Sequence, residues 1–271
     1  MTRGVLLFAQ NNQEVDYVAI ANLAATKVKQ YLRVPVSVVT NDPVADHYVF
    51  DQVIPVHDNT LSAKYFYDGT ESKKLHWKNS SRVQCFNLSP YDETLVIDVD
   101  YILNSKTLSY CWNQPRDFLI YQKSFDLAPW RDAAEFNHVS DFSIPFYWAT
   151  VFFFRKTVVT ESFFTIVDNI KSNWTYYKAL YQIHSTTFRN DLAFSIALHM
   201  MNGMAADSFA GHMPGKMFYT MGQDLLLDMN SDKMKFLVQR KDNLSSYIPL
   251  VTTGIDVHVM NKMSLMRCIN V

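Results

Sequence analysis

The chain has 271 residues, of which 48% are hydrophobic, 14% aromatic and 19% charged. This is enough apolar material to bury a full core, and it suits one large α/β domain as well as two small ones. The formal net charge of −1 excludes a global basic field that would hold nucleic acid, so only a local basic patch is left for such a partner.

The cysteines and the first residues bear on the compartment in which the protein works. Cys85, Cys111 and Cys268 are far apart and odd in number, which favours free thiols in a reducing cytosol. The apolar stretch within residues 1–9 is too short for a signal peptide or a membrane span. We therefore expect a cytoplasmic protein with no membrane partner. The sequence leaves the oligomeric state open.

The N-terminal part predicts a strand–helix–strand unit. Residues 4–9 predict a first strand, and Asn12 is placed to cap a helix from about residue 14 to residue 31. Two short strands are expected at 36–40 and 51–55. A strand, a helix and a second strand within so short a stretch are typical of a parallel sheet.

A polar and basic segment follows at residues 61–82. Its basic residues are interleaved with aromatic ones: Lys64, Tyr65, Phe66, Tyr67, Lys73, Lys74, Trp77, Lys78 and Arg82. The pattern suits the solvated face of a helix or loop. The alternative is a surface that binds nucleic-acid phosphates and stacks Trp77 on a base. A second basic cluster has the same two interpretations and comprises Lys233, Lys235, Arg240 and Lys241.

Apolar and aromatic runs place the remaining elements. We expect strands at 94–97, 118–121 and 146–154, helices at about 160–183 and 190–202, and further strands within 222–249, joined by turns at 230–232 and 242–243. Asn190 or Asp191 is placed to cap the second of these helices. Together the elements predict an α/β fold with a mostly parallel central sheet flanked by helices.

Two carboxylates directly follow the strand predicted at 94–97. Asp98 and Asp100 are separated by one residue at the end of an apolar run, as Asp-x-Asp. Open α/β folds bind ligands at that edge of the sheet. Carboxylate oxygens suit Mn²⁺ or Mg²⁺, and such an ion would neutralise a diphosphate. The alternative is a solvated loop whose carboxylates hold no ion.

Residues at the end of the first strand and in the aromatic run are further candidates for a binding site. Ala9, Gln10 and Asn11 stand where a nucleotide base could dock, or where the chain simply leads into the first helix. Trp148 could line a ligand pocket, although large aromatic residues are usually core.

The later part of the chain carries candidates for proton transfer and for charge neutralisation. Asn190 and Asp191 could bind or deprotonate a substrate, or else only begin a helix. His258 stands between two valines, which suits a structural histidine as well as a metal ligand. Lys262 offers a point charge for a phosphate, unless it is a surface lysine.

The order of these elements resembles that of metal-dependent glycosyltransferases with the GT-A fold, most closely the group of glycogenin and bacterial lipopolysaccharide galactosyltransferases. The resemblance implies that Asp98, Asp100 and His258 hold the metal, with Asp98 also near the donor ribose. It further implies that Lys262 and Arg82 contact the donor diphosphate. The spacing from His258 to Lys262 is shorter than is usual in the group.

The whole chain is also similar to uncharacterised glycosyltransferase-like proteins of T4-like and marine tailed phages, through residues 11–17, 88–98 and 257–262. Some such phages glycosylate 5-hydroxymethylcytosine in their own DNA, so this resemblance implies a DNA acceptor and the host cytoplasm. Alternatives are a carbohydrate acceptor, or a non-catalytic phage DNA-binding or virion protein on a degenerate glycosyltransferase fold. A nucleotidyltransferase is disfavoured, because Gly4 stands alone in the first 60 residues and forms no Gly-rich phosphate loop.

The protein implied by the resemblance is a single GT-A domain over residues 1–271. A nucleotide-binding half at 1–105 ends in Asp-x-Asp, and an acceptor half at 106–271 ends in the His/Lys tail. The implied reaction transfers a hexosyl or pentosyl group from a nucleotide sugar, a UDP-sugar, to an acceptor hydroxyl with Mn²⁺ or Mg²⁺ as cofactor. Inversion of the anomeric centre would need a base such as Asp191, whereas retention could use the departing diphosphate.

Overall fold

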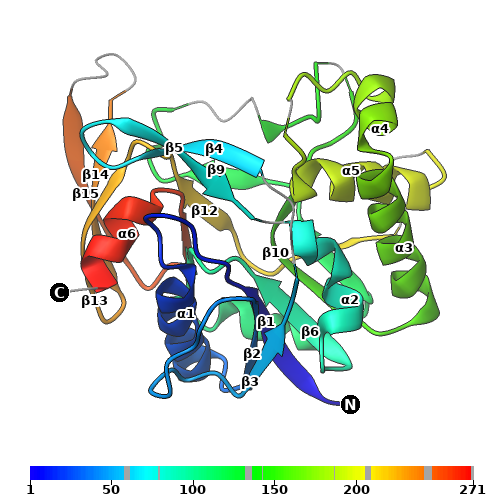
Figure 1. The fold of residues 1–271 in the computed structure, drawn as a ribbon, viewed down its shortest axis with the longest axis horizontal. Helices are drawn as coiled ribbons and strands as arrows, with labels where there is room; N and C mark the ends of the chain where they lie inside the picture. The colour runs from blue at the N-terminus through cyan, green and yellow to red at the C-terminus, as the bar shows by residue number, and fades with distance from the viewer. Residues whose placement is uncertain are drawn as a thin grey trace.

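A seven-stranded sheet forms the centre of the protein (Figure 1). The computed structural model describes residues 1–57, 62–78, 80–131, 136–141, 143–185, 187–204, 209–240 and 246–269. The strands lie in the order β11 (Gly211–His212), β8 (Phe118–Tyr121), β10 (Trp148–Arg155), β6 (Glu93–Ile97), β1 (Arg3–Phe8), β2 (Val36–Thr40) and β3 (Gln52–Pro55). Only β10 runs antiparallel to its neighbours, and the other four pairs are parallel. The predicted α/β fold with a mostly parallel central sheet is confirmed.

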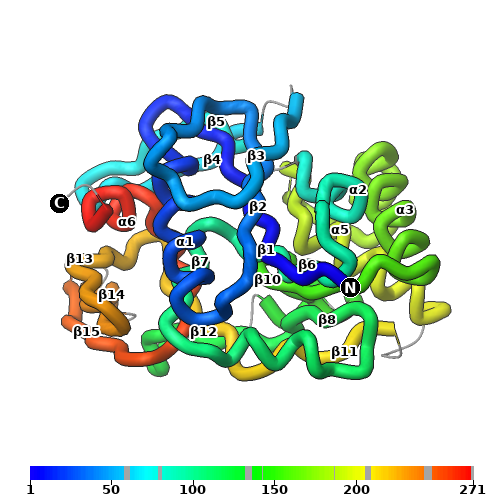
Figure 2. The backbone as a smooth tube through the Cα atoms, turned by 90° about the horizontal axis from the view of Figure 1, so that it is seen from below, coloured from blue at the N-terminus to red at the C-terminus, as the bar shows by residue number. Residues whose placement is uncertain are grey.

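Helices flank this sheet. They are α1 (Tyr17–Tyr31), α2 (Cys85–Leu88), α3 (Val158–Ser172), α4 (Trp174–Leu180), α5 (Asn190–Met201) and α6 (Lys262–Ile269), with the 3₁₀ helices η1 (Ser80–Gln84) and η2 (Thr107–Asn113). Figures 1 and 2 place α1 and α6 at one end of the molecule and α3 and α5 at the other. The helix predicted at 160–183 is divided at Asn173, which ends α3. No helix in the described ranges is long and apolar enough to cross a lipid bilayer.

Burial on both faces explains why these segments became strands. Every residue of β2 and β6 is buried, and so is every residue of β10 except the last. Branched and aromatic residues suit strands that are covered on both sides. The ring centroids of Phe152 in β10 and Phe194 in α5 lie 5.0 Å apart. The aromatic run is therefore core, as its composition indicated.

The first helix begins later than predicted. It starts at Tyr17, and Asp16 caps it by accepting a hydrogen bond from the Ala19 amide at 2.9 Å. Asn12 accepts instead from the amide of Val15 at 2.8 Å, which closes a turn before the helix. The predicted cap at Asn12 is thus wrong, because two good cap residues stand four positions apart and only the second meets the helix.

The cap predicted for α5 is also wrong. Arg189 is the N-cap residue, with extended backbone and no side-chain cap bond, and Asn190 and Asp191 are the first helical residues. The Asp191 carboxylate accepts instead from the Ala149 amide of β10, at 2.9 Å. A contact with another element has replaced the local capping bond that sequence preference favours.

Three smaller sheets extend the centre. The first contains β7 (Tyr101–Ile102), β16 (Val257–Val259), β12 (Met217–Thr220) and β9 (Ser124–Asp126). The second contains β13 (Leu225–Asn230), β14 (Lys233–Gln239) and β15 (Tyr247–Thr253), and the third is a hairpin of β4 (Ser62–Tyr67) and β5 (Ser72–Trp77). The hairpin corrects the solvated helix or loop expected at 61–82. The strands expected within 222–249 are present, whereas the predicted turn at 242–243 and Lys241 lie outside the described residues.

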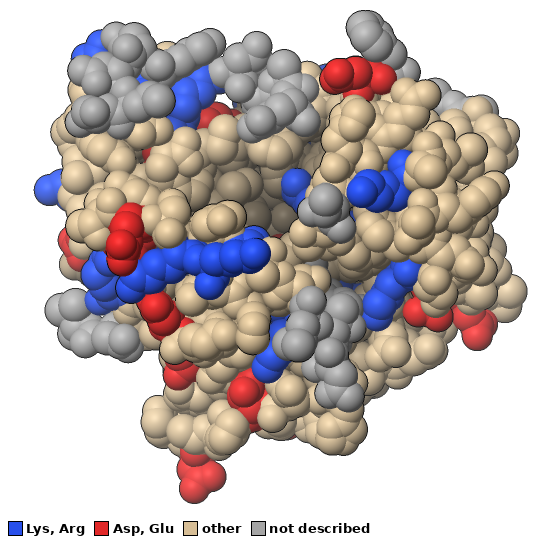
Figure 3. Space-filling view, turned by 45° about the horizontal axis from the view of Figure 1, so that its top comes forward, with Lys and Arg blue, Asp and Glu red and all other residues tan. Residues whose placement is uncertain are grey.

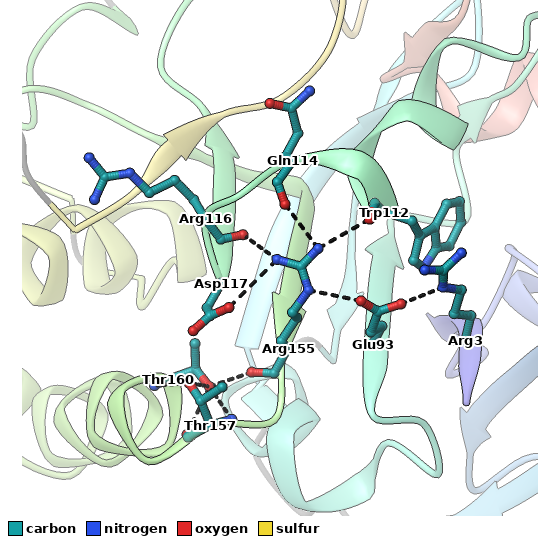
Figure 4. Close-up of polar contacts among 9 residues, drawn as sticks. All are labelled: Arg3, Glu93, Trp112, Gln114, Arg116, Asp117, Arg155, Thr157 and Thr160. Atoms are coloured by element: carbon teal, nitrogen blue, oxygen red, sulfur yellow. Dashed lines mark hydrogen bonds and ion pairs between the residues drawn. The ribbon is translucent and has the colours of Figure 1, made fainter. Parts of the chain in front are cut away.

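An ion-pair network around the buried Glu93 joins the starts of β1 and β6 to the end of β10 (Figure 4). Strand register sets Arg3 of β1 and Arg155 of β10 on either side of Glu93, the first residue of β6. Both arginines bond its carboxylate, Arg155 through Nε at 2.8 Å. Burial raises the pKa of Glu93, but the hydrogen bonds from Arg155 and Arg3 outweigh it and hold that pKa below its ordinary value. The network lies at the end of β6 opposite to Asp98.

Candidate functional site

The Asp-x-Asp pair stands where β6 leaves the central sheet. The strand ends at Ile97, and the Asp98 amide donates to the carbonyl of Thr150 in β10 at 2.8 Å. The Tyr101 amide then donates to the Asp98 carbonyl at 2.9 Å, which turns the chain into β7. Both carboxylates are therefore held at the carboxyl end of a buried strand, the edge at which α/β folds bind ligands.

His258 reaches the same point from the far end of the sequence. Its strand, β16, pairs with β7 so that His258 stands opposite Tyr101, and the Val259 amide donates to the Asp100 carbonyl at 2.8 Å. His258 Nε2 consequently lies 3.2 Å from Asp100 Oδ2. One ligand atom from each of Asp98, Asp100 and His258 lies within 4.8 Å of the other two. The imidazole is buried, and its Nδ1 has no hydrogen-bond partner in the described part of the chain.

Each carboxylate of the pair also has a basic partner. The Arg82 guanidinium pairs with Asp98 and donates to the Ala149 carbonyl at 2.9 Å, and the Lys262 ammonium pairs with Asp100. Burial raises the pKa of Asp100, but Lys262 and His258 outweigh it and hold that pKa well below its usual range. Asp100 is therefore an anion at neutral pH, as a metal ligand must be.

One residue of β10, Ala149, connects Arg82 with Asp191. Its amide donates to Asp191 Oδ1 at 2.9 Å, and its carbonyl accepts from Arg82. Ala149 lies in a bulge, because the pairing of β10 with β8 shifts register between Trp148 and Phe152. A bulge releases backbone groups from the sheet and often redirects residues beside a site. Asp191 Oδ2 accepts from Arg189 at 2.9 Å, so both oxygens have donors.

The three residues predicted to meet a nucleotide base are placed differently from one another. The Gln10 side chain lines the central cavity, is only 6% exposed, and neither atom of its amide has a hydrogen-bond partner among the described residues. Ala9 is buried in the sheet, and Asn11 accepts from the Val18 amide of α1 at 3.0 Å. Ala9 and Asn11 therefore support the turn, and Gln10 alone of the three lines the cavity.

These segments surround one cavity of about 430 Å³. It gathers most of the residues predicted for the site, namely Gln10, Arg82, Asp98, Asp100, Trp148, Asn190, Asp191, His258 and Lys262. Among its described lining residues, five are basic and three acidic, an excess of two positive charges. The face shown in Figure 3 is hollowed near its centre, with Lys and Arg side chains close to the hollow. The cavity thus suits an anionic ligand.

Several lining residues had no place in the predicted site. Lys64, on the β4–β5 hairpin, lies 4.3 Å from the ring centroid of Trp77 and pairs with no carboxylate in the described part of the chain. Burial, followed by the charge of Lys262, lowers the pKa of Lys64 well below its usual value. Tyr17 also lines the cavity, and its buried hydroxyl has no described hydrogen-bond partner.

A turn signal in the sequence could have located the hairpin that carries Lys64. Asp68 and Gly69 form an Asp-Gly pair between two segments of alternating polarity, which is a strong hairpin signal. Gly69 has a φ of 107°, and Asp68 Oδ1 accepts from the Thr70 amide at 2.8 Å. The hairpin therefore has a local cause, whereas its position over the cavity depends on tertiary contacts such as that between Arg267 and the Asp68 carbonyl.

Comparisons with known proteins find likenesses of structure. No family model and no curated protein matches the chain. It is similar to the glycosyltransferase GlyE of Streptococcus pneumoniae TIGR4, with 10% identity and a TM-score of 0.44, over 79% of this chain and 45% of GlyE. It is also similar to the galactosyltransferase LgtC in complex with donor and acceptor sugar analogs, with 12% identity and a TM-score of 0.47, over 77% of this chain and 72% of LgtC.

Another similar structure is described as a glucose-1-phosphate thymidylyltransferase from Bacillus anthracis in complex with sucrose. The identity is 11% and the TM-score 0.44, over 79% of this chain and 88% of that protein. The chain spans less than half the length of GlyE. With TM-scores below 0.5 throughout these three, the function of this chain must be argued from its own site.

Proposed function

We propose that this chain is a metal-dependent glycosyltransferase of the GT-A type that transfers a sugar from a nucleoside diphosphate donor, a UDP-sugar, to an acceptor hydroxyl. The observation that carries the proposal is the meeting of Asp98 and Asp100 with His258 and Lys262, from opposite parts of the sequence, at one buried point. This point lies in a cavity with excess positive charge. A metal ligand set beside a cationic pocket suits a diphosphate.

The residues present fit a divalent cation. Asp98 and Asp100 supply hard carboxylate oxygens, and His258 supplies an imidazole nitrogen that adds no negative charge. The unused buried Nδ1 of His258 is a further sign that the imidazole is built for more than packing. When bound, Mn²⁺ or Mg²⁺ would act as a Lewis acid toward the negative charge of the leaving diphosphate.

The basic residues and Gln10 give the donor its remaining contacts in this proposal. Arg82 and Lys262 lie against the two carboxylates and present charge to phosphate oxygens, in addition to Lys64 from the hairpin. The amide of Gln10 offers two donors and an acceptor to the edge of a nucleotide base. Trp148 forms part of the wall, with its ring centroid 5.6 Å from that of Tyr219.

The transfer itself needs one bond exchange and one proton acceptor. The bond from the anomeric carbon to the diphosphate oxygen breaks, and its electron pair leaves with the diphosphate. A bond forms from the acceptor oxygen to the anomeric carbon, and the acceptor proton is lost. Among the described acidic residues of the cavity, Asp191 is the one outside the metal triad. If the reaction inverts the anomeric centre, we assign Asp191 as the group that takes the acceptor proton, with Asn190 beside it binding the acceptor. If the reaction retains the anomeric configuration, the departing diphosphate takes this proton.

Three further details of the proposal rest on the sequence alone. The first is the division into a nucleotide-binding half at 1–105 and an acceptor half at 106–271. The others are that the protein works in the host cytoplasm of a phage, and that its acceptor is 5-hydroxymethylcytosine in phage DNA. Lys73, one of the expected DNA-binding lysines, pairs with Glu14 at 3.2 Å, so part of that basic segment is already neutralised. A carbohydrate acceptor is the second candidate, and the surface beside the cavity favours it, as argued below.

Calorimetric titration with UDP-sugars and Mn²⁺ tests the donor site. We expect the protein to bind a UDP-sugar only when the cation is present. The variants Asp100→Asn and His258→Ala should each weaken this binding at least tenfold, because each removes a ligand of the ion. Tyr110→Ala, which changes an exposed aromatic residue, is the matched control. Equal Mn²⁺-dependent binding by wild type and both site variants would refute the assignment.

A further inference from the structure

A second hollow lies beside the cavity and differs from it in chemistry. Its walls contain the tyrosines Tyr65, Tyr67 and Tyr247 and the glutamines Gln223 and Gln239, with two small residues completing them. None of the described residues that line this tyrosine–glutamine groove is charged, whereas the central cavity is lined by eight charged residues. The two hollows therefore suit different parts of a ligand.

The groove is continuous with the central cavity. Tyr65, Tyr67 and Gly222 line both of them. From the cavity the groove passes from the hairpin to the three-stranded sheet, where Gln239 ends β14 and stands opposite Tyr247, the first residue of β15. A ligand with one end at the metal triad thus has the groove directly beside it for its other end.

The groove presents aromatic faces and hydrogen-bonding groups together. Tyr65 is 70% exposed, so its side chain is accessible to a ligand in the groove. The hydroxyls of Tyr67 and Tyr247 lie 3.5 Å apart, and Gln223 lines the same groove. Aromatic faces pack on the C–H faces of sugar rings, and amides and phenols bond to sugar hydroxyls.

We propose that the tyrosine–glutamine groove binds the second and following units of a neutral saccharide acceptor, whose terminal hydroxyl enters the central cavity. This inference rests on the proposed transferase function and names its acceptor class. The absence of lysine and arginine among the described groove residues is the deciding feature against DNA, because a DNA acceptor carries phosphates that basic residues must neutralise.

Kinetics with acceptors of increasing length test the proposal. The assay contains a UDP-sugar, Mn²⁺ and one acceptor. The acceptors are mono-, di- and trisaccharides of glucose, galactose and N-acetylglucosamine, and a hydroxymethylated DNA duplex. We expect the KM of the preferred disaccharide to lie about tenfold below that of its monosaccharide. Gln223→Ala and Tyr247→Ala should reduce this ratio to about twofold or less. Tyr110→Ala, an exposed aromatic residue outside the groove, should keep the ratio of the wild type.

Several outcomes would overturn the proposal. One is an equal KM for mono- and disaccharides in the wild type. Another is a ratio of monosaccharide KM to disaccharide KM that stays unchanged in both groove variants while their thermal unfolding is intact. The third is transfer to the DNA duplex alone. Mn²⁺-dependent binding of the UDP-sugar is measured separately by calorimetry, and its absence in the wild type counts against the transferase function. In that case, saturation-transfer NMR with the same oligosaccharides tests the groove directly. Loss of the signal in the two variants supports the groove, and an absent or unchanged signal refutes it.

Discussion

At the level of single residues, Gln10 combines deep burial with an unused amide. A buried amide without partners costs about 1–3 kcal/mol, which folding alone would not retain. We therefore predict opposite effects of Gln10→Leu on stability and on binding. The free energy of unfolding should rise by about 1–3 kcal/mol, since the uncompensated polar group is removed. The affinity for a UDP-sugar should fall about tenfold, since the contact with the base is lost.

Urea unfolding and calorimetry measure these two effects on the same sample. Gln52→Leu, at an exposed position of β3, is the matched control and should change neither quantity by more than about 0.5 kcal/mol. A variant of Gln10 that loses stability and keeps its affinity would show that the amide serves the fold instead of the ligand.

At the level of elements, Glu93 ties the starts of β1 and β6 to the end of β10. Its pKa in the folded protein lies below the ordinary value because of Arg155 and Arg3, even though burial acts the other way. The ionised pair thus stabilises the fold above the unfolded pKa of about 4.3, and this stabilisation is lost as pH falls through the lower folded pKa. We predict that Glu93→Gln lowers the free energy of unfolding by about 1–3 kcal/mol at pH 7.

Urea unfolding at pH 7 and at pH 3 checks this prediction. The difference between wild type and Glu93→Gln should shrink at the lower pH, because the wild-type carboxylate is then increasingly protonated. Donor affinity should be unchanged at pH 7, since the network stands at the opposite end of β6 from Asp98. A pH-independent difference would assign the effect to packing instead of charge.

The hairpin of β4 and β5 is the element whose geometry matters to both hollows. Gly69 turns it with a φ of 107°, a conformation that an L side chain adopts only at a cost of about 1 kcal/mol or more. We predict that Gly69→Ala increases hydrogen exchange across 62–77 and raises the KM of donor and acceptor. The reason is that Lys64, Tyr65 and Tyr67 lie on this hairpin and line the cavity.

Gly203→Ala is the control for this variant. Gly203 has a φ of 65° with nothing near an added Cβ, so the substitution introduces a comparable backbone strain without touching either hollow. Equal kinetic effects of the two variants would contradict a specific contribution of the hairpin.

At the level of the whole molecule, a net charge of −1 gives the protein no overall electrostatic attraction for a polyanion such as DNA. We predict a Kd for an unmodified DNA duplex weaker than about 10⁻⁶ M at physiological salt, with a steep loss of affinity as salt rises. Fluorescence anisotropy with a labelled duplex at two salt concentrations measures this. Tight, salt-insensitive binding would restore DNA as the first candidate for the acceptor.

The central sheet was predictable because its strands are short apolar runs buried on both faces. Residues 94–97 and 118–121 appear as strands for this reason. The Asp-x-Asp pair follows from its place after such a run, and the meeting of Asp100 with His258 was expected only through a resemblance. Lys64 could not be assigned in the same way, because its place in the cavity depends on how the hairpin packs against distant segments. Local pattern carries no information on such contacts.

The bulge in β10 has a consequence for how this site tolerates change in evolution. Its displaced residue, Ala149, bonds Asp191 through its amide and Arg82 through its carbonyl, so one residue positions the proposed acceptor side and the proposed donor side. Loss or gain of a single amino acid in the bulge would move these backbone groups and misalign Asp191 and Arg82 together. We therefore expect the length of this short segment to tolerate less change than the residues that face solvent.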